Sequence, residues 1–575
     1  MKKLTSLLLF SLVAGCGSGP AHPKFGVRNG AGGEGNSTPM DSSNSTGSTA
    51  AGGTTGAGSI NAGLPTNPTS TTDYYASNLY LTPTVTPMRR LLNREYLASV
   101  KDILGIETSA YANRLVADGG GSFDNNILQQ SLDSKRLQGY VDVSMKVADA
   151  FFAATQQATT QMGCAPATAS VDCMTNFIKK IGRLAYRRDL DPTELAALVK
   201  VYTPDRPLDG MESVIASLFA SSNFLFVTET GVADANKPGY AKLKGAELAT
   251  KLSLLLLGKV PSADLLALAE KGSLDTPAGL EAQAHTILAS PEAKAYQRNF
   301  VRNWLSLDNV AQIVANGTGV SDSFKSVAPD LPEETYRLFD DFMKPGSKFM
   351  DVYTAPYTYM TTNVASIYKT TVTNPWQRVD LTPLPRRGFL SQPAVLASLG
   401  DHAYNSIFRG QFLALRILCQ DLGGLPPGTP MIDTSKASGT SERAILSTLT
   451  ANAACAACHK KMEPLGLGLE RYDGFGVYRT ADSKSNALTG AGNFTGTNPF
   501  TFTDEPGLAT QLHDRDDAKV CVVKKLTEYL LGRAPAMKGD ETTMLAMQTS
   551  LLNKDYVETL VTFIKSDSFT YRKKD

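Results

Sequence analysis

The stretch Cys455-Ala456-Ala457-Cys458-His459 is the only C-x-x-C-H sequence in this chain of 575 residues. This spacing is the attachment signature of a c-type haem, because two thiols three positions apart can reach the two vinyl groups on one edge of a porphyrin. The adjacent imidazole would then bind the iron as the proximal ligand, as in cytochromes. The motif predicts one covalent haem c bound through Cys455, Cys458 and His459, with His459 as a metal ligand.

Three other interpretations of the motif are a local disulfide, a thioredoxin-like redox pair and half of a zinc site. A thioredoxin-like pair belongs on a βαβ unit, whereas residues 451–454 and 460–461 on either side have a helical pattern. A zinc site needs a second ligand pair at suitable spacing, and the sequence has no other closely spaced Cys or His pair. Haem is therefore the favoured interpretation, and a structural disulfide is the main alternative.

The start of the chain predicts export. Lys2 and Lys3 precede a short apolar run at 4–13, which ends in Ala14-Gly15-Cys16. This order is typical of a secretory signal peptide that is too short to remain as a membrane span. The ending resembles the lipobox of bacterial lipoproteins, which predicts a signal peptide at 1–15 and a lipid on Cys16; an ordinary signal peptide with a chance cysteine is the alternative.

Residues 16–85 predict a disordered, low-complexity tether. Much of this segment is Gly, Ser, Thr, Ala and Asn, with few large apolar residues. Such a composition buries too little apolar surface to offset the entropy of ordering the chain. The tether would separate the folded part from a membrane in the periplasm, at the outer membrane or at the cell surface.

Overall charge gives no sign of a nucleic-acid partner. The chain has 56 basic and 55 acidic residues, so no excess charge favours nucleic acid or an acidic substrate. No other stretch is long and apolar enough to be a transmembrane helix. Membrane association is therefore expected only through the N-terminal lipid.

Four cysteines remain after Cys16 and the C-x-x-C-H motif are assigned, and export places them in an oxidising compartment. Cys164 and Cys173 are nine positions apart in a loop rich in small residues, which suggests a small-loop disulfide. Cys419 and Cys521 are then candidates for a long-range disulfide across the haem segment. Four cysteines allow three connectivities, so the sequence leaves the pairing open.

Apolar periodicity predicts a mainly α-helical, multi-domain protein. Helices are expected at 88–104, 134–155, 516–531 and 542–566, and Asp191-Pro192-Thr193-Glu194 has the pattern of a helix N-terminal cap. A small β-hairpin is expected at 490–503 near the C-terminus. The predicted domains are an N-terminal helical domain (86–205), a central helical domain (206–345), a haem-c-binding domain (346–485) and a C-terminal hairpin and helical domain (486–575).

The order of these segments resembles the multi-domain bacterial haem-c proteins of unknown function found in planctomycetes and their relatives. In that family, several uncharacterised domains surround one cytochrome-like C-x-x-C-H segment. The most specific match begins at Cys455 and continues through Met462-x-Pro464-Leu465-Gly466, Glu470-x-Tyr472-Asp473 and Gly476. Weaker matches include Arg89-Arg90 with Asn93-Arg94-Glu95-Tyr96, Arg386-Arg387-Gly388 with His402 and Arg409-Gly410, and Tyr529 to Arg533.

The resemblance covers residues 86–572 and implies a helical fold with one haem c. It implies no reaction, because the family has no firmly established one. Many relatives have an additional N-terminal cytochrome c domain, whereas this chain has only the low-complexity tether at that place. A relay between two haems within one chain is therefore not expected.

The sequence does not decide which residue would be the sixth ligand of the iron. His402 precedes a helix in a block that resembles the family's haem-adjacent block, so it is the candidate second metal ligand. Met462 is too close to His459 on the same helix face to reach across the iron, and a Met ligand would raise the reduction potential. The other candidates that spacing permits are His285, His513, Met431, Met537, Met544 and Met547.

Charged residues near the motif allow two interpretations. Arginines such as Arg409, Arg479 and Arg533 could pair with haem propionates, or they could form ordinary salt bridges. Glu470 and Asp473 have the pattern of residues that cap a helix end or turn, so we predict no catalysis from them.

The predicted function is electron transfer by an exported haem-c lipoprotein to a redox partner protein outside the cytoplasm. One alternative is a haem-dependent oxidoreductase, peroxidase-like or oxidase-like, which acts on a secreted substrate. Another is an interaction scaffold whose cysteines form only disulfides. Two strong iron ligands favour the carrier, and an exchangeable sixth position favours the enzyme.

Overall fold

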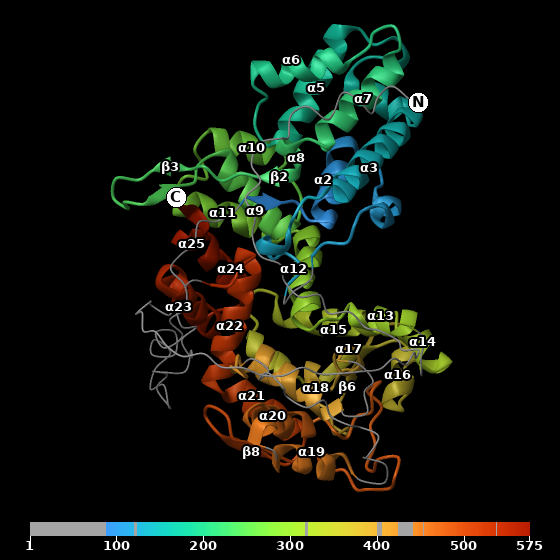
Figure 1. The fold of residues 1–575 in the computed structure, drawn as a ribbon, viewed down its shortest axis with the longest axis vertical. Coiled ribbons are helices and arrows are strands. Elements are labelled where there is room, and N and C mark those ends of the chain that lie inside the picture. Colours follow the sequence, from blue (N-terminus) through green and yellow to red (C-terminus); the bar gives the residue numbers. More distant parts are fainter. Residues whose placement is uncertain are drawn as a thin grey trace, which may run out of the picture. The chain divides into compact units, whose positions relative to one another are not determined.

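The computed structural model describes residues 88–119, 123–316, 320–399, 405–423, 441–451, 453–535 and 537–574. Helices dominate these residues, and the strands among them form only short antiparallel pairs or a three-stranded sheet (Figure 1). The mainly α-helical prediction is confirmed. The predicted signal peptide, Cys16, the tether and His402 lie outside the described residues.

The N-terminal part of the described chain packs around one hydrophobic cluster that includes Tyr96, Phe151 and Phe177. Two short strands, β1 (Arg89–Arg90) and β2 (Phe226–Val227), form an antiparallel pair. Its helices are α2 (Asn93–Leu104), α3 (Ser134–Ala153), α4 (Thr155–Met162), α5 (Val171–Tyr186), α6 (Pro192–Val201), α7 (Pro207–Phe219) and α8 (Ser222–Leu225).

The first helix starts later than predicted. Residues 89–90 form β1, and α2 begins at Asn93, because Arg89 and Arg90 pair with Val227 and Phe226 of β2. The apolar periodicity of a single segment carries no signal for a partner so distant in the sequence. The cap of α6 is confirmed, since the Asp191 side chain accepts hydrogen bonds from the backbone N–H groups of Thr193 and Glu194.

A second, larger hydrophobic cluster joins the central helices to the rest of the chain. Two short strands, β5 (Tyr357–Met360) and β6 (Gln377–Asp380), pair beside it. Its central helices are α9 (Ala246–Leu257), α10 (Ala263–Glu270), α11 (Pro277–Leu288), α12 (Pro291–Trp304), α13 (Asn309–Asn316), α14 (Asp322–Val327), α15 (Leu331–Phe342), α16 (Thr362–Tyr368) and α17 (Pro393–Ser398).

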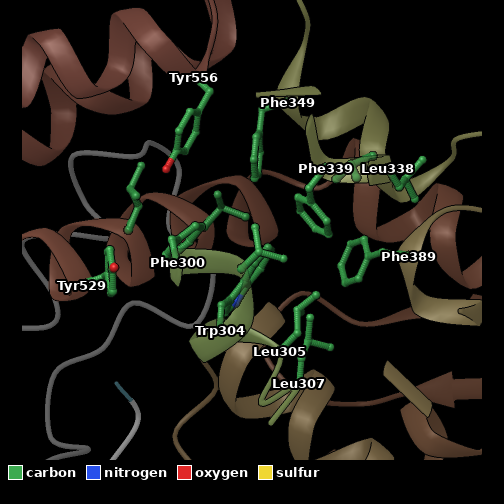
Figure 2. Packing of buried hydrophobic residues seen from close by; sticks show 14 of the residues in the cluster. Phe300, Trp304, Leu305, Leu307, Leu338, Phe339, Phe349, Phe389, Tyr529 and Tyr556 are labelled. Carbon is green, nitrogen blue, oxygen red and sulfur yellow. The ribbon is translucent and has the colours of Figure 1, made fainter. Parts of the chain in front are cut away.

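Aromatic rings form the middle of this larger cluster (Figure 2). The rings of Phe300 and Trp304 in α12 stack with 5.5 Å between their centroids, and Trp304 also contacts Phe389 at 5.7 Å. The indole N–H of Trp304 donates to the backbone carbonyl of Arg416 at 3.0 Å. Trp304 therefore connects the central helices to the segment that leads to the C-x-x-C-H motif.

The C-terminal part of the chain contains the C-x-x-C-H motif, and its last helices pack against the central helices. In Figure 1, α22 and α24 lie beside α12 and α11. Its elements are α18 (Asn405–Phe412), α19 (Glu442–Ala451), α20 (Ala453–Leu467), β7 (Gly492–Phe494), β8 (Phe500–Phe502), α21 (Glu505–Asp514), α22 (Asp516–Leu531), α23 (Met537–Asn553), α24 (Tyr556–Lys565), α25 (Asp567–Thr570) and β9 (Tyr571–Lys573).

The predicted hairpin at 490–503 is confirmed by β7 and β8. The predicted helix at 542–566 is wrong in one respect, because it is divided into α23 and α24. Asp555 interrupts it: its side chain caps α24 by accepting a hydrogen bond from the Glu558 N–H and also accepts one from the Gly346 N–H. Near the end of the chain, β9 pairs with β4 (Tyr240–Lys242), which pairs with β3 (Val232–Ala233).

Two buried carboxyl groups affect how the stability of this core depends on pH. Glu334 of α15 is fully buried and accepts hydrogen bonds from the Thr358 and Tyr368 hydroxyls at 2.8 Å and 2.5 Å. Burial raises the pKa of Glu334 to about 7 and that of Glu505 to about 8. A raised carboxyl pKa means that the folded state favours the protonated form.

We expect Glu334→Gln to reduce the loss of stability at alkaline pH. The stabilisation from protonated Glu334 is fully present below its ordinary pKa of 4.5 and is lost as pH rises through about 7. We compare the free energy of unfolding of the variant with that of the unmodified chain at each pH. The difference in favour of the variant should be larger at pH 8 than at pH 5 by up to about 3 kcal/mol. Urea unfolding of both proteins at the two pH values measures this difference, and an unchanged pH dependence in the variant would contradict it.

Candidate functional site

Helices α18 and α20 cross in direct backbone contact at two glycines. A Cβ atom on Gly466 of α20 would lie 1.7 Å from the Ser406 carbonyl oxygen, and one on Gly410 of α18 would lie 2.0 Å from the Met462 carbonyl oxygen. Only glycine permits so close an approach. This crossing fixes the position of α20, which contains the C-x-x-C-H motif.

Arg409 holds the C-terminal end of α20. Its guanidinium is fully buried in α18 and donates to the backbone carbonyls of Leu469 and Tyr472 at 2.9 Å and 2.7 Å. These contacts satisfy carbonyl groups that follow the last turn of the helix. Arg409 therefore has a structural role in the crossing, and the suggested pairing with a haem propionate gains no support.

The other two arginines suggested as propionate partners also have structural partners. Arg533 forms an ion pair with the buried Asp540 at 2.8 Å. Arg479 donates to the Glu470 carbonyl oxygen at 3.4 Å. The interpretation as ordinary protein contacts therefore accounts for each.

Glu470 and Asp473 organise the turns after α20, as predicted. The buried Glu470 carboxylate pairs with Arg443 of α19 at 2.7 Å and accepts hydrogen bonds from the N–H groups of Thr489 and Gly490. Asp473 Oδ1 accepts from the backbone N–H groups at 475 and 477. Both carboxylates are occupied by structural contacts.

Cys455 and Cys458 lie one helical turn apart on α20 as free thiols. Cys455 is buried, and Cys458 Sγ contacts the Leu422 carbonyl oxygen at 2.9 Å. Residues three apart in a regular helix have Cβ atoms about 5–6 Å apart, whereas a disulfide brings them to roughly 3.5–4.5 Å. The helical backbone thus keeps both thiols apart and oriented to the same side.

His459 follows on the same helix, and Glu463 determines which ring nitrogen is free. His459 Nδ1 lies 2.7 Å from Oε1 of Glu463, whose side chain is buried. A carboxylate only accepts hydrogen bonds, so it favours the tautomer with the proton on Nδ1. The lone pair of the neutral ring is then on Nε2, which makes no hydrogen bond with the residues that the structure describes. A carboxylate behind a metal-binding imidazole is a common arrangement in metalloproteins.

These groups form the donor set of a covalent haem, namely two thiols and one imidazole nitrogen. Within the described ranges, no group of three or more His, Cys, Asp and Glu side chains is arranged to hold a metal ion by itself. Haem needs no such group, because the porphyrin supplies four nitrogen ligands to the iron. The residues present therefore fit haem c.

Of the candidate sixth ligands, His402 and Met431 lie outside the described residues, as does the side chain of Met537. The imidazoles of His285 and His513 face carboxylates, with His285 Nε2 at 3.1 Å from Glu558 and His513 Nδ1 at 2.6 Å from Asp514. Met544 and Met547 are buried in α23. The structure brings none of these four residues to His459, and His402 stays a prediction.

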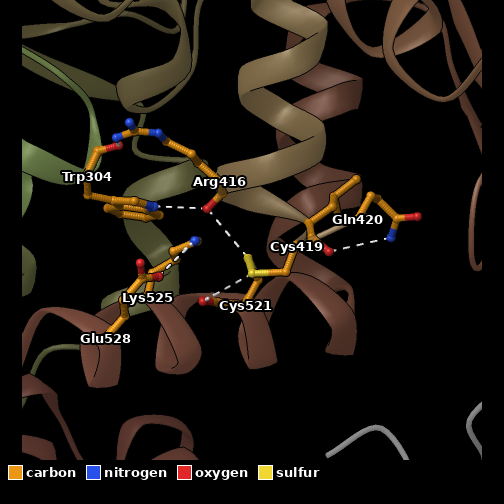
Figure 3. The surroundings of a disulfide bond; sticks show 8 residues. Trp304, Arg416, Cys419, Gln420, Cys521, Lys525 and Glu528 are labelled. Carbon is orange, nitrogen blue, oxygen red and sulfur yellow. Dashed lines mark hydrogen bonds and ion pairs between the residues drawn. A yellow bond between two sulfur atoms is a disulfide. The ribbon is translucent and has the colours of Figure 1, made fainter. Parts of the chain in front are cut away.

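Both suggested disulfides are present, Cys164–Cys173 and Cys419–Cys521. The second connects the segment after α18 to Cys521 of α22, and Cys521 Sγ also contacts the Arg416 carbonyl (Figure 3). Three residues after Cys419, Leu422 contacts Cys458. The disulfide therefore holds the segment that borders the C-x-x-C-H motif. Two disulfides indicate a protein that matures outside the cytoplasm.

A cavity of about 1010 Å³ lies apart from the motif, and its lining includes none of Cys455, Cys458 and His459. The lining residues come from β1, α9, α12, the end of α22, α23 and the β9 region. No local sequence pattern indicates this cavity, because the segments that line it are far apart in the chain. In the part of the chain that the structure describes, no helix has the length and apolar character of a membrane span.

Four family models match successive parts of the chain. Residues 89–153 match PSD3, residues 173–229 match PSD5, residues 243–370 match PSD4 and residues 386–482 match PSCyt3, each described as a protein of unknown function (DUF1587, DUF1595, DUF1592 and DUF1588). The last match, whose name marks a cytochrome-like family, contains the C-x-x-C-H motif. The set fits the multi-domain family that the sequence suggested. Neither the curated proteins nor the solved structures include a match to this chain.

Proposed function

We propose that this protein is an exported lipoprotein that binds one c-type haem covalently and transfers electrons with a partner protein outside the cytoplasm. The proposal rests mainly on the arrangement on α20. Two free thiols lie one turn apart, followed by an imidazole whose Nε2 makes no hydrogen bond with the described residues. When bound, haem supplies a one-electron iron couple. The match to a cytochrome-like family model over residues 386–482 supports the same function.

The chain's own residues position these donors. The glycine contact between α18 and α20 fixes the helix, and Glu463 orients the His459 ring. The Cys419–Cys521 disulfide holds Leu422 against Cys458. A site supported by rigid surrounding contacts changes little in geometry when the iron changes oxidation state, which suits electron transfer.

Export is supported by the two disulfides, and the lipid anchor rests on the sequence of residues 1–16. A lipid on Cys16 and the tether at 16–85 would attach the folded part to a membrane while leaving it free to meet its partner. The near balance of basic and acidic residues gives no reason to expect nucleic acid as that partner.

Carbon monoxide binding tests the carrier function, because it shows whether a strong sixth ligand already occupies the iron. The mature protein is produced in a host with haem-c maturation machinery, and spectra of the reduced form are recorded with and without carbon monoxide. An unchanged spectrum supports a carrier with two strong ligands. The His402→Ala variant should then bind carbon monoxide, whereas the control His285→Ala should not. Rapid binding by the unmodified protein would contradict the carrier function.

A haem-dependent oxidoreductase is the second candidate, because aromatic contacts lead from the separate cavity toward the motif. Tyr529 lines that cavity, and its ring lies 5.7 Å from Phe300, which stacks on Trp304. Trp304 donates to the Arg416 carbonyl, which also contacts Cys521. Binding of carbon monoxide by the unmodified protein would show an exchangeable sixth position and so favour this enzyme function. The aromatic contacts would then make the cavity the candidate substrate site.

We expect Glu463→Gln to raise the reduction potential of the haem. The Glu463 carboxylate next to Nδ1 would make the imidazole a stronger donor to a bound iron and so would stabilise its oxidised form. Loss of this charge should raise the potential by roughly 60 mV, which corresponds to a tenfold change in the relative binding of the two oxidation states. A spectroscopic redox titration measures the shift. Glu558→Gln, which alters the partner of His285, is the control, and an unchanged or lower potential in Glu463→Gln would contradict this role.

A further inference from the structure

The cavity of about 1010 Å³ has the size of a small-molecule site, since ligand pockets measure roughly 300–1,000 Å³. Its lining combines residues from separate family matches, including Glu95, Glu229 and Leu254, with Tyr529 and Arg572 from beyond those matches. Ligand sites occur preferentially where domains meet. No residue assigned to the haem site contributes to it.

Basic residues exceed acidic residues in the lining, by seven to four. All four acidic residues are paired within the lining. Glu95 pairs with Arg89 at 2.7 Å and Asp540 with Arg533 at 2.8 Å. Asp567 pairs with Lys237, and Glu229 pairs with Lys251. The excess positive charge favours an anionic ligand.

Arg572 is the cation with spare hydrogen-bonding capacity. It donates to the backbone carbonyl of Glu229, and its Nε is buried without a hydrogen-bond partner among the described residues. It forms no ion pair with the described carboxylates. Lys251 also contacts Glu229, with Nζ 3.3 Å from the Glu229 carboxylate and 5.2 Å from the centre of the Phe569 ring. Glu229 thus brings the two cations to one part of the cavity.

The remaining lining is largely apolar or aromatic. Tyr296 and Tyr529 are joined there by Leu254, Leu530 and Ala546. Such a surface can hold the hydrocarbon or aromatic body of a ligand while a few polar groups fix its orientation.

We infer that this cavity binds a small organic carboxylate, whose charged group is held by Arg572 and Lys251. The planar guanidinium matches a planar carboxylate in two parallel hydrogen bonds. The Glu229 carboxylate, which pairs with Lys251 at 3.3 Å, disfavours the higher charge of a phosphate dianion. The apolar body of the ligand contacts the tyrosine and leucine side chains. This inference does not depend on haem.

Titration calorimetry of the mature, disulfide-intact chain with 4-phenylbutyrate tests the inference. We expect saturable binding, with the neutral 4-phenylbutyramide at least about tenfold weaker, because it lacks the charge-assisted hydrogen bonds. Arg572→Gln should weaken carboxylate binding by about tenfold or more. Arg378→Gln, on strand β6 and outside the cavity, is the matched control and should bind as the unmodified chain does.

A second variant tests the cation site independently of Arg572, and a second ligand distinguishes a carboxylate from a phosphate. Lys251→Met should weaken carboxylate binding even if Arg572→Gln fails to fold, and circular dichroism checks the fold of each variant. The inference is overturned if 4-phenylbutyrate does not bind, if the amide binds equally well, or if folded Arg572→Gln or Lys251→Met retains full affinity. Tighter binding of 3-phenylpropyl phosphate would overturn the carboxylate assignment.

Discussion

Removal of the Cys419–Cys521 disulfide is expected to lower the free energy of unfolding by about 5 kcal/mol. The bond joins residues 102 positions apart, and a cross-link that closes so long a loop removes much conformational entropy from the unfolded chain. It also holds the segment that ends at Leu422, next to Cys458. The same change should therefore reduce the fraction of molecules that acquire haem.

The measurement uses Cys419→Ser/Cys521→Ser, which leaves no unpaired thiol at this site, in urea unfolding at constant pH. The control is Cys164→Ser/Cys173→Ser, whose bond closes a loop of nine positions and should cost only roughly 2–3 kcal/mol. Haem content of the two purified variants is compared in the same preparations. Equal stability losses, or normal haem loading without the long-range bond, would contradict the role assigned to Cys419–Cys521.

The second large effect is expected from Gly466→Ala, which should lower the free energy of unfolding by about 3 kcal/mol or more. In an exposed helix interior, Gly→Ala is stabilising by up to about 1 kcal/mol. Here the new methyl group would lie 1.7 Å from the Ser406 carbonyl oxygen and 2.8 Å from the Gly410 nitrogen. Both are backbone atoms that cannot rotate away, so α18 and α20 must separate.

Gly507→Ala in α21 is the matched control, since its nearest contact is a side-chain oxygen of Asp504 at 3.1 Å. We expect it to change stability by less than about 1 kcal/mol. Thermal and urea unfolding of both variants give the comparison. If Gly466→Ala is as stable as the unmodified chain, the close helix crossing does not position the motif.

Local signals predicted much of the fold. The Asp191 cap, the hairpin at β7 and β8, and helix α22 follow from short-range patterns of turn residues and apolar periodicity. Long-range contacts were not predictable in this way. Strand β1 forms because residues 226–227 lie beside it, and Asp555 divides the last helical segment partly through a contact with Gly346.

The donor residues of the candidate site were predictable from the sequence, whereas the residues that position them were only partly predictable. The motif itself predicted the donors Cys455, Cys458 and His459. Glu463 stands four positions after His459, so helical spacing could have identified it as the partner of Nδ1. The role of Arg409 could not be read from the sequence, because it depends on carbonyl groups about 60 residues further along the chain. The cavity at Arg572 was not predictable either, because its lining comes from segments that are far apart in the sequence.

The most direct test of the proposed haem site is the intact mass of the mature protein made with haem-c maturation machinery, followed by peptide mapping. We expect the added mass of one haem, resistant to acid-acetone extraction, on the peptide that contains Cys455 and Cys458, and we expect no added mass in Cys455→Ala/Cys458→Ala. Unmodified thiols at both positions, or a Cys455–Cys458 disulfide, would contradict it.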